Sequence, residues 1–103
     1  MVEKRKNERW GSLKIIYVLN QESFIGYLED ISLEGMKLMS ELPIPVGKTI
    51  QLSIEDDQIL TLEAQSIWEK KDTEFNEYYT GFKFLNLTQD TIAQINRFII
   101  GSK

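Results

Sequence analysis

The chain has 103 residues, 42% of them hydrophobic and 27% charged, which is the size and composition of one globular domain. It contains neither histidine nor cysteine, so disulfides, thiolate metal sites and the commonest general base are excluded. No apolar run approaches the roughly 18 residues of a membrane span, and the charged N-terminus does not resemble a signal peptide. We therefore expect a soluble cytoplasmic protein that needs neither a metal nor a cofactor.

The net charge of −4 is unevenly distributed along the chain. Residues 1–9 carry a net charge of +2, which leaves −6 for the remainder. An acidic body does not suit the backbone of DNA or RNA, because binding there requires a basic footprint. A short basic arm on an acidic body favours a small anionic ligand, and we expect neither a nucleic acid nor a membrane as partner.

Residues 1–10 show no apolar periodicity and are predicted to form a flexible arm. Alternating and β-branched segments then predict six short strands, separated by polar turns and by a loop with prolines at 43 and 45. The first connection is expected at residues 20–23, and the charged residues 70–77 are expected to form a flexible loop. The predicted strands are 13–19, 24–31, 36–39, 49–54, 60–68 and 78–85.

The end of the chain changes to a helical period over residues 88–100. Thr88 is a good N-cap, and Asp90 lies in the first turn, where the helix dipole favours it. Apolar residues on this helix and on the last strand are predicted to be core: Phe82, Phe84, Ile92, Ile95, Phe98 and Ile99.

These elements predict an all-β fold with a C-terminal helix. We expect one domain over residues 1–103, made of an arm at 1–10, a six-stranded antiparallel barrel at 11–86 and a helix at 88–100. The helix is expected to cover an end or a flank of the barrel.

A polar corner between the second and third predicted strands carries Asp30, Ser32 and Gly35 in the pattern D-x-S-x-x-G. Asp30 and Ser32 are two apart, so an extended backbone places both on the same face. Gly35 permits a positive φ or a close backbone approach. Upstream, Arg5 and Arg9 form an R-x-x-x-R pair, and we expect the two segments to meet over one ligand. Asp30 and Ser32 also suit simple turn capping, which can coexist with binding.

Together, these two motifs and the segment Tyr79-Thr80-Gly81-Phe82-Lys83-Phe84 before the final helix resemble the PilZ domain family. The resemblance extends from about Arg5 to the C-terminal helix. It implies a six-stranded antiparallel barrel that binds the bacterial second messenger cyclic di-GMP.

The resemblance also implies roles for individual residues. Arg5 and Arg9 would contact guanine edges and phosphates, which suits the planar fork of arginine. Asp30 would accept hydrogen bonds from the guanine N1 and N2 hydrogens. Ser32 would bond a phosphate, and Gly35 would leave room for the ligand.

Three further residues are candidates for the same site: Lys4, Lys6 and Trp68. In the family, a basic residue before the first arginine is associated with binding of an intercalated ligand dimer. Lys4 occupies that position, so the resemblance makes it a candidate for this mode of binding. Trp68 could stack near the ligand, although a core or barrel-rim position is the favoured interpretation.

Three classes of function remain in competition. The first is a cyclic di-GMP receptor that acts as a ligand-switched adaptor for an unidentified protein partner. The second is a degenerate barrel of the same kind that serves only protein–protein contacts and would be expected to have lost part of the motifs. The third is an enzyme, for which no nucleophile or base arrangement assembles from spacing.

Overall fold

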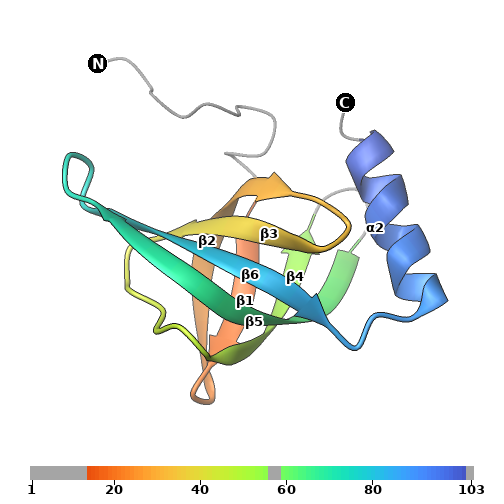
Figure 1. Cartoon of the computed structure of the whole chain (residues 1–103), viewed down its shortest axis with the longest axis horizontal. Helices are drawn as coiled ribbons and strands as arrows, with labels where there is room; N and C mark the ends of the chain where they lie inside the picture. Colours follow the sequence, from red (N-terminus) through yellow and green to blue (C-terminus); the bar gives the residue numbers. More distant parts are fainter. Residues whose placement is uncertain (1–13, 56–58, 102–103) are drawn as a thin grey trace.

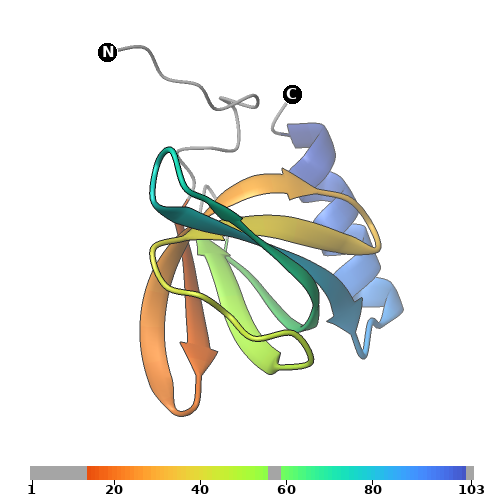
Figure 2. The same ribbon diagram turned by 60° about the vertical axis from the view of Figure 1, so that its left-hand side comes forward.

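The computed structural model describes residues 14–55 and 59–101. Six antiparallel strands close into a barrel in the neighbour order β1-β2-β3-β6-β5-β4 (Figure 1), which confirms the expected fold class. Figure 2 shows the strands curving round the closed interior. The elements are β1 (Lys14–Leu19), β2 (Glu22–Ile31), β3 (Gly35–Ser40), β4 (Thr49–Glu55), β5 (Ile59–Asp72), β6 (Glu77–Leu85) and α2 (Gln89–Gly101).

The barrel interior is filled by the inward-facing side chains of all six strands. Ile15 and Tyr17 alternate on β1 with exposed neighbours. On β4, the buried residues Ile50, Leu52 and Ile54 alternate with exposed or half-buried ones. Burial raises the pKa of Tyr17 above its usual 10.0, and a hydrogen bond with Ser40 partly offsets that rise. Because side chains occupy the interior, a ligand must bind on the outer wall.

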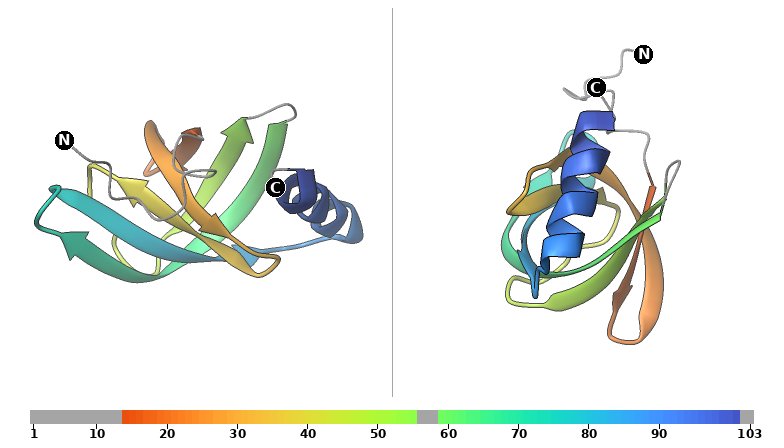
Figure 3. Two further views of the ribbon diagram at one scale, coloured as in Figure 1. Left: turned by 90° about the horizontal axis from the view of Figure 1, so that it is seen from above. Right: turned by 90° about the vertical axis from the view of Figure 1, so that its right-hand side faces the viewer.

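Helix α2 lies on one side of the barrel, and the tip of the β5–β6 hairpin lies on the opposite side (Figures 1 and 3). The Thr91 amide donates to Thr88 Oγ1 at 3.1 Å, so the predicted N-cap is confirmed. Ile95 and Phe98 are buried against the core, but Ile92 is 40% exposed and its prediction as core was wrong. Ile92 lies about 120° round the helix axis from Phe98, outside the narrow stripe that meets the barrel.

Two predicted connections are shorter in the structure. Asn20 and Gln21 alone join β1 to β2, with φ of 53° and 70°, as type I′ turns require, so residues 22 and 23 belong to the strand. The predicted loop at 70–77 is reduced to 73–76, because Lys70 and Lys71 pair with Tyr79 and Tyr78 on β6. Because this hairpin extends past the barrel core, its strands need not alternate apolar and polar residues, and a run of charged residues can form a strand there.

The loop between β3 and β4 is attached to β5 through Ser66. The Ser66 hydroxyl donates to the Pro45 carbonyl at 2.6 Å and accepts from the Lys48 amide at 2.9 Å. Farther along β5, Glu69 Oε2 accepts from the Ile44 amide at 3.1 Å. Ser66 is buried. Loss of its hydroxyl would therefore deprive the Lys48 amide and the Pro45 carbonyl of this hydrogen-bond partner, at a cost in desolvation free energy.

We therefore expect Ser66→Ala to lower the free energy of unfolding by about 1–3 kcal/mol. For a domain of this size, each kcal/mol corresponds to a fall in Tm of about 4–8 °C. Thermal and urea unfolding followed by circular dichroism will measure it. Ser53→Ala is the matched control, because the Ser53 hydroxyl makes an exposed 3.5 Å contact with Thr61. Equal losses in the two variants would contradict the role given to Ser66.

Candidate functional site

A hollow of about 390 Å³ lies on the outer wall where β2, β3, β6 and β5 are neighbours. It contains three residues of the predicted corner, Asp30, Ser32 and Gly35, together with Trp68 from β5. The structure therefore brings together all the described candidates of the sequence analysis. The remaining lining residues are Ile31, Glu34, Met36, Lys37, Ile67, Phe82 and Lys83.

Asp30 reaches this wall because of a β-bulge in β2. Leu28 pairs with Leu38 and Asp30 pairs with Lys37, so Glu29 is the extra residue between them. Strict alternation would place Asp30 on the same side as Leu28, which is fully buried in the core. The bulge reverses the alternation, so Asp30 is exposed and Ile31 is buried.

A second bulge does the same for Trp68 in β5. Ser66 pairs with Phe82 and Trp68 pairs with Gly81, so Ile67 is the extra residue. Ser66 is buried, whereas Ile67 is 48% and Trp68 42% exposed. The Trp68 indole occupies the space that a side chain at Gly81 would need. Of the two positions favoured for Trp68, the core is therefore excluded, because the bulge turns the residue to the outer wall.

The two bulges align four residues in one row across the wall. The register joins Asp30 to Lys37, Lys37 to Gly81, and Gly81 to Trp68. Since neighbouring strands are about 4.8 Å apart, the row from β2 to β5 spans roughly 14 Å. It presents a carboxylate at one end, an aromatic face at the other and an ammonium group between them. Such a row can accept hydrogen bonds from a base edge, stack a ring and attract an anion.

Hydrogen bonds within the corner hold it in shape. Asp30 Oδ1 accepts from the Ile31 amide at 2.9 Å, and Ser32 Oγ accepts from the Glu34 amide at 3.3 Å. The Phe84 amide donates to the Glu34 carbonyl at 2.9 Å and ties the corner to β6. The turn-capping interpretation is thus correct for both side chains. A carboxylate offers about four acceptor positions, so capping leaves Asp30 able to bind a donor.

Gly35 serves the second of its two predicted roles, close backbone approach. A Cβ at this position would collide with the carbonyl oxygen of Phe82 on β6. Among the described glycines, a positive φ occurs at Gly47 and not at Gly35. Gly35 is therefore required where β3 begins to pair with β6.

Sequence reasoning missed two cations in this hollow, Lys37 and Lys83. A usable signal was present, because the runs Met36-Lys37-Leu38 and Phe82-Lys83-Phe84 alternate apolar and charged residues. Once the apolar neighbours are placed in the core, each lysine must face outward. The predicted candidates Lys4, Arg5, Lys6 and Arg9 lie outside the described residues.

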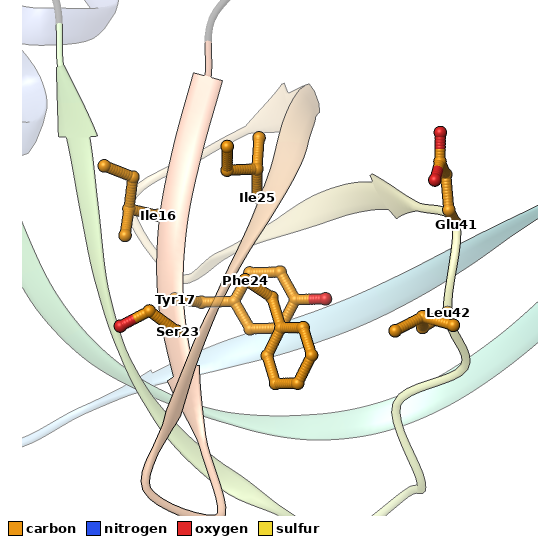
Figure 4. A pocket seen from close by; sticks show the side chains of 7 residues that line it. All are labelled: Ile16, Tyr17, Ser23, Phe24, Ile25, Glu41 and Leu42. Atoms are coloured by element: carbon orange, nitrogen blue, oxygen red, sulfur yellow. The ribbon is translucent and has the colours of Figure 1, made fainter.

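A larger hollow, of about 560 Å³, lies beside the β1–β2 hairpin (Figure 4). Its lining is mainly apolar, and the Tyr17 and Phe24 rings in it stack with centroids 5.6 Å apart. Among the described residues that line it, Glu41 alone is charged. With no cation among these residues, this hollow lacks the attraction for an anion that the corner's hollow offers. Within residues 14–55 and 59–101, no group of three acidic residues is arranged to hold a metal ion.

The sequence profile of the PilZ domain matches residues 3–101, nearly the whole chain. The chain belongs to the PilZ family. No curated protein matches the sequence. In the described part of this PilZ domain, no helix is long and apolar enough to cross a membrane.

Solved structures show the same fold at low sequence identity. The PilZ domain of Escherichia coli YcgR, determined with c-di-GMP, has a TM-score of 0.72 and 20% identity over 87% of this chain and 81% of its own. Bacillus subtilis MotI, an inhibitor of motility, has a TM-score of 0.73 and 14% identity over 97% and 51%. Borreliella burgdorferi PlzA in complex with c-di-GMP has a TM-score of 0.60 and 16% identity over 85% and 44%.

The close approach at Gly35 predicts a stability cost for any side chain there. We expect Gly35→Ala to destabilise the PilZ domain by about 1–3 kcal/mol, because the added methyl forces β3 away from the Phe82 carbonyl. Gly47→Ala is the comparison: its Cβ meets nothing within 4 Å, and only the positive φ of 92° opposes it, at about 1 kcal/mol. Urea unfolding will rank the two variants, and a smaller loss at Gly35 would contradict this packing role.

Proposed function

We propose that this PilZ domain is a receptor for cyclic di-GMP that binds on the outer wall at Asp30, Ser32 and Gly35. The observation that carries the proposal is the convergence of this corner with Trp68 in one hollow of the family's barrel. The YcgR domain and PlzA, which share the fold, were determined with c-di-GMP. A nucleotide dianion is also the kind of small anionic ligand that the charge distribution favours.

The chemistry of the row matches the parts of a guanine nucleotide. Asp30 accepts from the N1 and N2 hydrogens of guanine, a pair of donors that adenine does not offer. The exposed face of Trp68 stacks a base, an interaction worth about 1–3 kcal/mol. Ser32 donates a hydrogen bond to a phosphate, and Gly35, which has no side chain, leaves room for the ligand beside it. Each group thus has one assigned role.

Arg5 and Arg9 complete the site from the N-terminal arm. Lys14, the first described residue, pairs with Tyr27, three positions before Asp30 on β2. Arg9 precedes Lys14 by five residues, a span of up to about 17 Å in an extended chain. The arginines can therefore reach a ligand on the wall and contact guanine edges or phosphates. Lys4 and Lys6 are additional candidates in the same segment, and Lys4 favours an intercalated ligand dimer.

The output of the receptor is a ligand-switched surface for a protein partner in the cytoplasm. The barrel wall is fixed by its register, so an arm that closes over the ligand supplies the new surface. The proposal includes no catalysis, since no hydrogen bond joins a nucleophile to a base among the described residues that line the hollow. The competing hypothesis, a degenerate barrel for protein contacts alone, requires a defective site, whereas the corner keeps Asp30, Ser32 and Gly35.

Binding is tested directly by isothermal titration calorimetry of the whole chain with cyclic di-GMP. We expect a Kd of about 1 μM or tighter, which corresponds to about −8 kcal/mol, and weaker binding of cyclic di-AMP and GTP. Discrimination against cyclic di-AMP follows from the donor edge that Asp30 reads. An absence of heat at ligand concentrations far above micromolar would reject the receptor and favour the interaction-only barrel.

Single variants locate the site. Arg9→Ala should weaken binding by about tenfold to a hundredfold, the loss of a charged or bidentate hydrogen bond. Asp30→Ala should weaken binding and also reduce the preference for cyclic di-GMP over cyclic di-AMP. Lys70→Ala is the control, because Lys70 lies on β5 outside the hollow. If Lys70→Ala and Arg9→Ala weakened binding equally, non-specific charge would explain the affinity.

A further inference from the structure

The strands β3 and β6 carry the same three-residue pattern, glycine, an inward apolar residue and lysine. On β3 it is Gly35-Met36-Lys37, and on β6 it is Gly81-Phe82-Lys83. The strands are antiparallel, and the register pairs Gly35 with Lys83 and Lys37 with Gly81. Each lysine therefore faces the glycine of the other strand, and the two patterns are related by a local two-fold axis.

This arrangement places two lysines on one area of the outer wall. Lys37 and Lys83 are diagonal neighbours across the strand pair, which separates them by roughly 7–8 Å at the backbone. Met36 and Phe82 face the core, so both lysines face outward, and both line the hollow. Lys37 Nζ lies 5.9 Å from the centre of the Tyr79 ring, a cation–π distance that keeps it near the wall.

The charges that line the hollow balance without a ligand. Among the described residues that line it, Asp30 and Glu34 are negative and Lys37 and Lys83 are positive. A cyclic dinucleotide adds two negative charges, one on each phosphate. Two carboxylates alone would repel it, so the barrel's own cations must offset them.

We propose that Lys37 and Lys83 are the charged phosphate contacts of the barrel wall, beside the Ser32 hydroxyl, one for each phosphate of the cyclic dinucleotide. This inference rests on the proposed function. The local two-fold axis of the wall then matches the two-fold symmetry of cyclic di-GMP. Lys37 lies beside Gly81, whose side-chain space the Trp68 indole fills, so a base stacked on the indole brings its phosphate toward Lys37.

Glutamine variants of the full chain test the proposal by calorimetry with cyclic di-GMP. We expect K37Q and K83Q each to weaken binding by about threefold to tenfold, and the double variant to weaken it further. Between about 0.05 M and 0.25 M salt, the double variant should lose less affinity than the wild type, because fewer ion pairs form. The conservative variants K37R and K83R keep the positive charge and should retain most of the wild-type affinity.

Lys70→Gln is the matched control, since Lys70 is an exposed lysine of the same barrel outside the hollow. Affinities of K37Q and K83Q equal to that of K70Q would overturn the inference and leave the receptor intact. A loss in only one of the two variants would overturn the assignment of one lysine to each phosphate. Failure of the wild type to bind cyclic di-GMP would instead overturn the proposed function, and this inference with it.

Discussion

The fixed alternation of side chains along a strand is the constraint on which this site depends. In a closed barrel, alternate residues fill the core, so a residue faces the wall or the interior according to its position alone. Asp30 would fall on the core side with Leu28 if β2 were regular. The extra residue Glu29 reverses the faces, and Ile67 does the same on β5 for Trp68. Two one-residue insertions thus bring a carboxylate and an indole onto the same outer wall.

Much of this architecture follows from the sequence, because period and turn chemistry are local signals. The six strands, the helix after Thr88 and the placing of Asp30 beside Ser32 need only alternation, capping and spacing. The bulges do not follow from these signals, since each is defined by the partner strand. That is why a core or barrel-rim position was favoured for Trp68. Lys70 and Lys71 are a similar case. Local composition assigned them to a loop, but they belong to β5 because they pair with β6 beyond the barrel core.

Glycine acts in two different ways in the wall. Gly35 is needed by the protein itself, because the Phe82 carbonyl occupies the space where its Cβ would lie. Gly81 has no side chain, and the Trp68 indole lies in the space that a side chain there would need. From sequence, Gly35 was expected to provide either a positive φ or a close backbone approach, and the resemblance added room for the ligand. The structure shows the close approach at Gly35, and it shows that the Trp68 indole covers Gly81.

Rigidity of the wall determines how a ligand can produce a signal. The corner is tied to β6 through the Glu34 carbonyl, and β6 is paired on both edges with β3 and β5. Moving either bulge along its strand would turn the side chains between its old and new positions to the other face. A core residue of the same strand, such as Leu28 on β2, would then be exposed, at a cost of about 1.5–3 kcal/mol. Under the proposed function, a bound dianion would therefore change the charge and the surface of the wall, while the shape of the barrel is retained.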